Sequence, residues 1–229
     1  MRLSVFYILL LVLGTCTVYS QHYEAVDIKQ IKEEITNKDS KFYYPNLYER
    51  YANNDTSLSI TDYRYLYYGH SLQAYFNPNI IHTDDSVKAL RKLTRAENSD
   101  PARVAQLAEF VLRLDPFSLE AIFSAGVAYE VLGDSAKSGI YIDRYFKIIK
   151  AILESGSGKT TDSALVVNSI SDEYSVIYAL GLKPLSQGLI EENGKNYDLI
   201  QVDEDNKLGL KSVYFDVELF IHFNSSNTR

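Results

Sequence analysis

The chain has 229 residues, with 23 Lys and Arg against 30 Asp and Glu, so its formal net charge is −7. This acidic balance argues against nucleic-acid binding and against docking on anionic lipid, because both need a basic surface. Hydrophobic residues make up 46% of the chain and charged residues 23%, which argues against global disorder. A chain of this length forms one domain or two small ones, and it buries enough surface to fold without disulfides.

The first twenty residues predict export. Residues 3–13 are apolar but too short to span a bilayer, a positive residue precedes them, and the small residues Val18 and Ser20 stand before Gln21 as a signal peptidase requires. We therefore expect a signal peptide over residues 1–20, cleavage between Ser20 and Gln21, and a periplasmic or secreted protein. The mature chain then has no Cys, so Cys catalysis and Cys-ligated zinc are excluded.

Two alternatives are open for this segment. Leu13-Gly14-Thr15-Cys16 resembles a lipoprotein box that would place a lipid on Cys16, although Thr is a poor residue directly before that Cys. The other alternative is an uncleaved anchor. No later stretch approaches the length of apolar chain that a membrane span needs. We expect no transmembrane span after signal removal, and a single domain over residues 21–229.

Helical spacing of apolar residues dominates the first two thirds of the chain. Ser59 or Thr61 can cap an aromatic helix, Pro101 suits a first helical position, and Asp115-Pro116 ends the helix that begins there. The predicted helices cover residues 25–36, 45–52, 62–76, about 87–93, 101–114, 121–132 and 135–153.

The period of the pattern changes after Gly156-Ser157-Gly158, which we expect to be a flexible joint. Asn193-Gly194 is a typical hairpin turn, and the chain alternates strictly near its end, as a half-buried strand does. The predicted elements here are a strand over residues 164–167, a helix over 171–180, a hairpin through Leu189-Ile190 whose partner strand covers 197–202, and a strand over 212–223.

Residues 116–145 resemble a tetratricopeptide repeat. Ile122, Ala125-Gly126 and Tyr129 hold the large, small and aromatic places of its first helix, and Gly133-Asp134 matches its inter-helix turn. Gly126 would let the paired helix approach the backbone closely. The predicted fold class is α+β, with tetratricopeptide-like helical hairpins (helical part 24–155) followed by a helix and a small antiparallel sheet (160–224).

Several segments carry a resemblance to a known family. They are KFYYPNLYERY (41–51), TDYRYLYYG (61–69), the Gly-x-Gly-Lys joint (156–159), SDEY (171–174) and the Tyr197-Asp198 strand. On these segments the chain resembles domain-of-unknown-function family 4919, exported proteins common in Gram-negative gut anaerobes. The resemblance implies export and a single α+β unit. It implies no activity, because the family has no established one.

Patterns that could hold a cofactor fail on their spacing. Gly156-Ser157-Gly158-Lys159-Thr160 resembles the end of a phosphate-binding loop, but Leu153 stands where the motif needs its first Gly, and a helix precedes it instead of a strand. Residues 203–206 lack the Gly and the bidentate Glu that a calcium loop needs further on. The His residues do not pair at metal spacing; they are His22, His70, His82 and His222. We expect no nucleotide, no metal and no other cofactor.

No residue is assigned a catalytic role. The chain has no Gly-x-Ser-x-Gly elbow. Its carboxylate pairs, such as Glu33-Glu34 and Glu191-Glu192, are adjacent in sequence, as on solvated faces. A glycosidase needs two carboxylates that face each other across a cleft, which a sequence does not reveal. Enzymatic activity is therefore open, and a non-enzymatic role is favoured.

The Tyr-rich segment supplies the candidate site. Nine of the 19 Tyr fall between Tyr43 and Tyr75. On a helical wheel of residues 62–76, Tyr63, Tyr67 and His70 lie opposite the expected core stripe. Either this is a Tyr-rich core, or Tyr63, Tyr67 and His70 form a binding face, since exposed Tyr favours interfaces.

Three functional hypotheses follow. The leading one is a non-catalytic exported protein that binds another envelope protein or peptide. The alternative is carbohydrate binding or processing on the Tyr-rich face, and the third is a hydrolase with a dispersed site. Aromatic platforms with nearby carboxylates in a cleft would favour sugar.

Overall fold

The structure is a computed structural model that describes residues 23–79, 84–96 and 98–221. The predicted signal peptide, its cleavage site at Ser20 and Gln21, and the alternative lipid site at Cys16 lie outside these residues. So do His22, His82 and His222.

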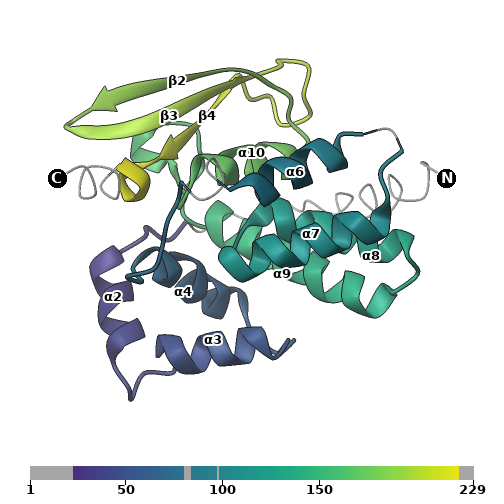
Figure 1. The fold of residues 1–229 in the computed structure, drawn as a ribbon. Helices are drawn as coiled ribbons and strands as arrows, with labels where there is room; N and C mark the ends of the chain where they lie inside the picture. Colours follow the sequence, from purple (N-terminus) through teal and green to yellow (C-terminus); the bar gives the residue numbers. More distant parts are fainter. Residues whose placement is uncertain (1–22, 80–83, 97, 222–229) are drawn as a thin grey trace.

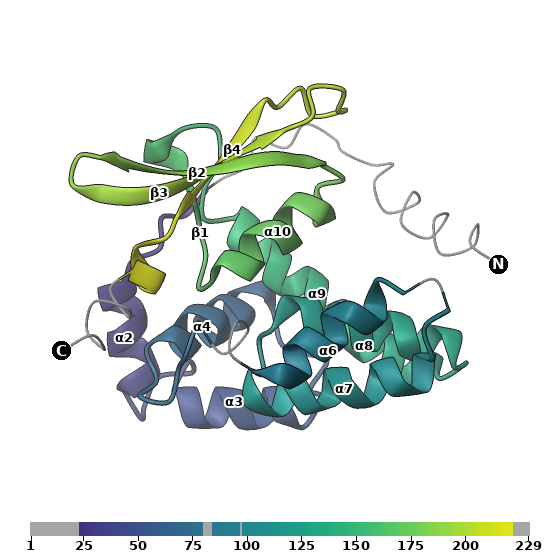
Figure 2. The same ribbon diagram turned by 45° about the horizontal axis from the view of Figure 1, so that its top comes forward.

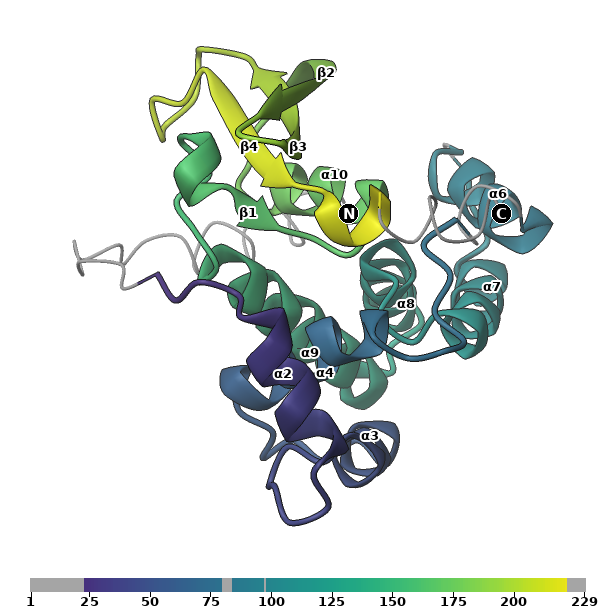
Figure 3. The same ribbon diagram turned by 90° about the vertical axis from the view of Figure 1, so that its left-hand side faces the viewer.

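A sheet lies on one side of the molecule, a helix packs under it, and the remaining helices form a thick layer below (Figure 1). Figure 3 shows the same order of layers from the side, with α10 between the sheet and the helical layer. The helices are α2 (Ile28–Thr36), α3 (Tyr44–Ala52), α4 (Ile60–Ser71), α6 (Asp85–Thr94), α7 (Pro101–Leu114), α8 (Leu119–Val131), α9 (Ser135–Leu153) and α10 (Ile170–Ala179). This α+β fold is the predicted class.

Local signals place most helix starts. Ser59 and Asp62 form a reciprocal capping box at the start of α4. Asp100 caps α7, which has Pro101 at its first position, and Asp134 caps α9. The predicted bounds of α7 and α9 are confirmed. α4 is shorter than the predicted helix over residues 62–76, because the chain leaves the helix after Ser71 in turns that include Gln73 N–H donating to His70 O.

The sheet has four strands in the order β1-β4-β3-β2 (Figure 2). They are β1 (Leu165–Val166), β2 (Pro184–Glu192), β3 (Lys195–Val202) and β4 (Ser212–Asp216). Asn193 and Gly194 join β2 to β3 with positive φ at both residues, as a two-residue hairpin requires. The sheet is mixed rather than wholly antiparallel, because β1 pairs parallel to β4.

β4 is shorter than the predicted strand over residues 212–223. The Asp216 side chain accepts a hydrogen bond from Glu218 N at 3.0 Å, and Ile221 N donates to Val217 O at 3.0 Å. A short polar side chain that binds the backbone two residues on competes with a strand ladder. The chain therefore turns helical over residues 218–221, and the rest of the predicted strand lies outside the described residues.

The expected flexible joint at Gly156-Ser157-Gly158 is a fixed connection. A Cβ at Gly156 would overlap the carbonyl oxygens of Ser163 and Ala164. Gly158 has a φ of +67°, its N–H donates to Ser163 O at 2.8 Å, and its carbonyl accepts from Tyr214 N at 2.8 Å. Only Gly suits a close backbone approach and a positive φ of this kind.

One hydrophobic core joins the helical part to the sheet. It includes Leu47 and Tyr68 from the helices and Phe215 from the sheet. A second, smaller cluster lies among α6, α7 and α8. α8 and α9 approach closely at Gly126, where a Cβ would lie 2.7 Å from Ile142 Cδ1. This close approach is the one expected of Gly126.

Candidate functional site

The predicted binding face on α4 is buried. The exposed fractions are 3% for Tyr63, 0% for Tyr67 and 4% for His70. α2, α3 and α9 all pack against α4, and the Tyr67 hydroxyl reaches α10. The expectation that these residues form an exposed face is therefore wrong. Its physical cause is that α4 is apolar or aromatic on every side, which is typical of a central helix.

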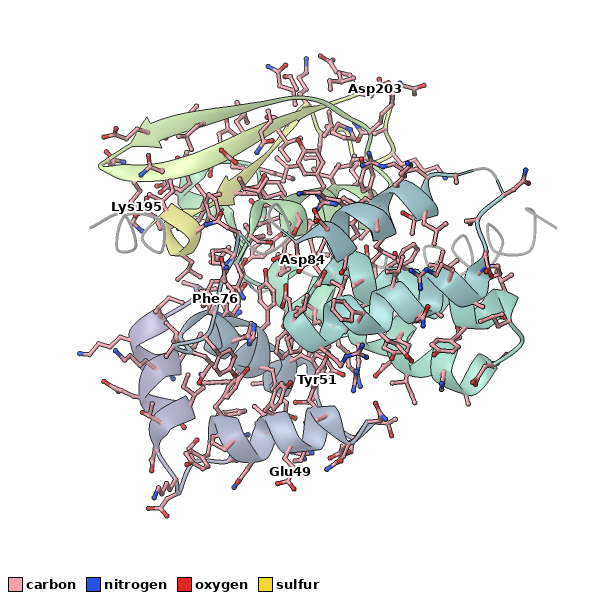
Figure 4. The ribbon with its side chains drawn as sticks, viewed as in Figure 1. Glu49, Tyr51, Phe76, Asp84, Lys195 and Asp203 are labelled. Atoms are coloured by element: carbon pink, nitrogen blue, oxygen red, sulfur yellow. The ribbon has the colours of Figure 1, made fainter. Side chains whose placement is uncertain are left out.

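The structure separates Tyr63 from the other two residues. Tyr63 lines a hollow with Tyr51 and Arg144, and the Arg144 guanidinium lies 4.0 Å from the centre of the Tyr51 ring. Figure 4 labels Tyr51 where α3 meets the remaining helices. Tyr67 and His70 line a different hollow, which we call the acidic hollow.

The acidic hollow opens where the helical layer meets the start of α10. Its volume is about 260 Å3 counted out to its open mouth, and its enclosed part has room for about one water molecule. Figure 4 labels Phe76 at this junction. The lining residues are Tyr67, His70, Phe76, Pro78, Asp115, Phe117, Asn168, Ser169 and Asp172.

Three separate segments supply the polar groups of the hollow. Tyr67 and His70 come from α4, Asp115 from the turn between α7 and α8, and Asn168 and Asp172 from the turn after β1 and the first turn of α10. The cap of α7 fixes Asp115, since its N–H donates to Val111 O. The polar groups therefore sit on the ends of helices that the core holds in place.

Tyr67 ties the floor of the hollow together. Its hydroxyl donates to Asp172 Oδ2 at 2.8 Å and accepts from Asn168 N at 2.9 Å. The Asn168 side-chain amide donates to Tyr67 O at 2.7 Å. The other end of that side chain, Asn168 Oδ1, is buried and has no hydrogen-bond partner among the residues that the structure describes. An unpaired buried acceptor costs about 1–3 kcal/mol.

The His70 imidazole is uncharged and packs against aromatic rings at one side of the hollow. Its Nδ1 lies 3.1 Å from the Tyr44 hydroxyl, and its ring centre lies 4.9 Å from that of Phe117. Burial lowers the pKa of His70 to about 4, so the imidazole is uncharged at neutral pH. Its Nε2 lies 3.6 Å from Asp115 Oδ1, which is too long for a direct hydrogen bond.

The two carboxyl groups are held at unusual pKa values. Burial raises the pKa of Asp115 to about 6 and the pKa of Asp172 to about 7, and the charge of Asp115 adds to the second shift. Desolvation disfavours the charged form of a carboxyl group. Among the residues that the structure describes, none that lines the hollow is Lys or Arg. At neutral pH the hollow therefore carries negative charge that no cation lining it neutralises.

The next residue on α10 belongs to a second buried cluster. Gln187 Nε2 donates to Asp198 Oδ2 at 2.6 Å and to Glu173 Oε2 at 3.1 Å. Burial, together with the neighbouring Asp198, raises the pKa of Glu173 to about 10. Glu173 is therefore protonated at neutral pH, and the cluster fastens the middle of β2 to α10.

Sequence reasoning did not identify Asp115, Asn168 or Asp172. In the sequence, Asp115 stands before Pro116 and was interpreted as the end of a helix. Asp172 lies in a predicted helix start that is rich in Ser and acidic residues. Both patterns are common at solvated helix ends. One sequence signal was available: α4 has Tyr or Leu on every side, so its polar residues Arg64 and His70 had to meet polar partners from other segments.

The described part of the chain contains neither a helix suited to cross a membrane nor a cluster suited to bind a metal ion. Over residues 23–79, 84–96 and 98–221, no helix combines the length and the apolar character that crossing a membrane requires. The same residues contain no group of three or more His, Cys, Asp and Glu that could hold a metal ion.

The fold and the hollow define an α+β protein with a small acidic and aromatic site between its helical layer and α10. A family model matches this chain over residues 29–225, and its description is domain of unknown function (DUF4919). The chain belongs to this family. No curated protein and no solved structure matches it.

Proposed function

We propose that this chain is a non-catalytic, exported binding module whose acidic hollow receives an amine group from a partner protein or peptide. The observation that supports the proposal is the combination of size and charge in one hollow. The hollow has room for about one water molecule and carries Asp115 and Asp172, and none of its described lining residues is Lys or Arg. An ammonium group is about as large as a water molecule, and its positive charge is opposite to the negative charge of the hollow.

The number of acceptors also fits an ammonium group. A Lys ammonium has three N–H donors and no acceptor. The hollow offers the carboxylate of Asp115 and the carboxyl group of Asp172, which together have four oxygens. Charge-assisted hydrogen bonds to carboxylates are about twice as strong as neutral ones. A bound amine would also stabilise the ionised forms of both carboxyl groups.

The ring lining supports the same ligand. Tyr67, Phe76 and Phe117 contribute rings to the hollow, and an aromatic face attracts a cation within about 6 Å of its centre. A Lys side chain has an apolar stem that can lie along such rings while its charged end enters the hollow.

A peptide array with paired spots tests this proposal. Each spot carries a Lys-containing peptide, and its pair carries the same peptide with the Lys acetylated, which removes the charge. We expect retention of a subset of the free-Lys spots and loss on their acetylated pairs. Binding should strengthen as the pH rises through about 6 and about 7, where Asp115 and Asp172 ionise. Equal retention on both spots of each pair would contradict the proposal.

Matched variants locate the binding. Asp115 lies at the mouth, with its side chain 19% exposed, and Asp115→Asn removes its charge but keeps an acceptor for Phe117 N. We expect this variant to weaken binding by about tenfold or more. Asp205→Asn removes an exposed charge outside the hollow and should leave binding unchanged. Equal affinity of Asp115→Asn and wild type would place the peptide elsewhere.

Carbohydrate binding or processing is the second candidate. Two carboxyl groups beside aromatic rings are a combination that glycosidases use, with one carboxyl group as the acid and the other as base or nucleophile. The enclosed space is against it, because a sugar ring is much larger than one water molecule. A glycan array with the same protein tests it, and retained oligosaccharides with no retained peptide would favour this candidate.

Export supplies the setting of the proposed function. It is supported by the sequence of the first twenty residues, with Val18 and Ser20 before Gln21. The intact mass of the protein from the periplasm should correspond to a chain that begins at Gln21. A diacylated Cys16 would instead establish a lipoprotein, and a retained Met1 would contradict both.

A further inference from the structure

The acidic hollow combines two features that favour different forms of an amine. Aromatic rings line it, and rings attract a cation whether or not that cation can donate hydrogen bonds. Carboxyl groups line it as well, and they favour a cation that has N–H donors. Methylation separates the two effects, because a methylated Lys keeps its charge but loses one N–H for each methyl group. The balance of rings and carboxyl groups therefore decides which form of Lys the hollow can bind.

The enclosed part of the hollow is too small for a methylated amine or a guanidinium group. It has room for about one water molecule, which an ammonium group can replace. Trimethyl-Lys carries a methyl group in place of every hydrogen of the ammonium, and Arg ends in a planar group of one carbon and three nitrogens. Either group would have to stay at the open mouth or push the walls apart.

Hydrogen bonds and ring contacts fix the walls around this space. Tyr67 is fully buried, and its hydroxyl donates to Asp172 Oδ2 at 2.8 Å. The centre of the Phe117 ring lies 4.9 Å from that of His70 and 4.9 Å from that of Tyr51. Buried side chains that are packed in this way do not separate without a cost in stability. The enclosed space therefore does not expand easily for a larger group.

The acceptors of the hollow suit an ammonium group that has all its donors. Asp115 Oδ1 accepts a hydrogen bond from Phe117 N at 3.1 Å, and Asp172 accepts one from Tyr67. A carboxylate has about four acceptor sites, so both groups can accept further hydrogen bonds from a ligand. A Lys ammonium has three N–H donors and trimethyl-Lys has none. Each methyl group therefore removes a charge-assisted hydrogen bond and also adds bulk.

We propose that the acidic hollow selects an unmodified Lys side chain and rejects methylated Lys and Arg. This inference rests on the proposed amine site and adds the chemical class of its ligand. The size of the hollow and its carboxyl groups act in the same direction, whereas rings alone, as in an aromatic cage, bind methyl-Lys well. Of the described rings that line the hollow, Phe76 is the most exposed, at 9%, and it packs edge-on against His70. Phe76 therefore limits the width of the hollow on its solvent side.

A methylation series tests the selection. Each free-Lys peptide that the array retains is synthesised again with monomethyl-, dimethyl- and trimethyl-Lys and with Arg at the same position. We expect the dissociation constant, measured by fluorescence anisotropy, to rise by about threefold or more with each methyl group and by about thirtyfold or more for trimethyl-Lys and for Arg. A trimethyl-Lys or Arg peptide that binds as tightly as its free-Lys parent overturns the inference but leaves the amine site in place. Failure of the amine site itself is a different result, namely equal retention of free and acetylated Lys.

A widened hollow tests the contribution of size. Phe76→Ala removes the ring on the solvent side, so the ratio of the trimethyl-Lys to the free-Lys dissociation constant should fall by about threefold or more. Phe146→Ala removes a ring that is 38% exposed on α9, outside the hollow, and should keep the wild-type ratio. The melting temperatures of both variants are compared with that of wild type first. Because each ratio is measured within one variant, a smaller folded fraction does not imitate the effect. A wild-type ratio in Phe76→Ala overturns the size argument.

Discussion

Asp172→Asn should make the stability of the protein less sensitive to alkaline pH. Burial raises the pKa of Asp172 from 3.8 to about 7 in the folded chain. The folded state therefore holds a proton that the unfolded state releases between these values. The stability that this proton provides is complete below about pH 4 and is lost as the pH rises through about 7. Asn does not titrate, and its side-chain oxygen can still accept the hydrogen bond from the Tyr67 hydroxyl.

The size of the effect follows from the two pKa values. Between about pH 5 and about pH 8 the unfolded carboxyl group is already ionised, while the folded one changes from protonated to mostly ionised. Each unit of difference in pKa corresponds to about 1.4 kcal/mol. Over this interval the wild-type chain should lose roughly 2–3 kcal/mol of unfolding free energy more than Asp172→Asn loses.

Urea unfolding followed by far-UV circular dichroism measures this difference. Wild type, Asp172→Asn and Asp205→Asn are each unfolded at several values between about pH 5 and about pH 8. Asp205 is exposed, so its variant should follow the wild-type pH dependence. If Asp172→Asn loses as much stability as wild type over this interval, Asp172 is ionised in the folded chain and the hollow is more polar than the structure indicates.

Three further predictions concern packing and the Gly-rich connection. Gly126→Leu should destabilise the protein by about 1–3 kcal/mol in urea unfolding, because Ile142 occupies the space of the added side chain. Gly139 on α9 has open space around it, so Gly139→Ala should stabilise the protein by up to about 1 kcal/mol. Tyr68→Ala should cost about 3–5 kcal/mol. Tyr63→Ser combined with Tyr67→Ser should cost at least as much, since both rings are buried, and a double variant as stable as wild type would contradict that burial. Lys159 is exposed, so Lys159→Ala should keep the wild-type melting temperature. An ATP-dependent rise in the melting temperature of wild type that Lys159→Ala abolishes would show that residues 156–160 bind nucleotide.

Elements with strong local signals could be predicted from the sequence. α7 begins at Pro101 after Asp100 and ends before Asp115-Pro116, and each of these residues restricts the backbone locally. The hairpin turn at Asn193-Gly194 was equally recoverable, because few residues adopt positive φ. β4 was predicted too long, since alternation continues past Asp216 and only the side-chain hydrogen bond of that residue reveals the end of the strand.

The environment of α4 and the acidic hollow could not be predicted in the same way. A helical wheel gives the direction of each side chain but not what packs against it. Tyr67 and His70 were predicted, with Tyr63, to form an exposed binding face, but they are buried against Asp115, Asn168 and Asp172, which lie in segments far away in the sequence. Only the tertiary arrangement of α4, the turn after α7 and the start of α10 brings these groups together, and no local propensity encodes it.

The position of β4 determines when the sheet can be assembled, because β4 links β1 to β3. β4 is the last strand among the residues that the structure describes, yet it lies between β1 and β3. The β2–β3 hairpin can form early from neighbouring residues, but β1 joins the sheet only through β4. A chain that stops before Ser212 would lack the core side chains of Val213 and Phe215, which are 1% and 0% exposed, and would leave the apolar surface beneath them open to aggregation and proteolysis. The sheet and the core beneath it are therefore completed only after the ribosome has synthesised β4, whereas the separate cluster among α6, α7 and α8 does not need that strand.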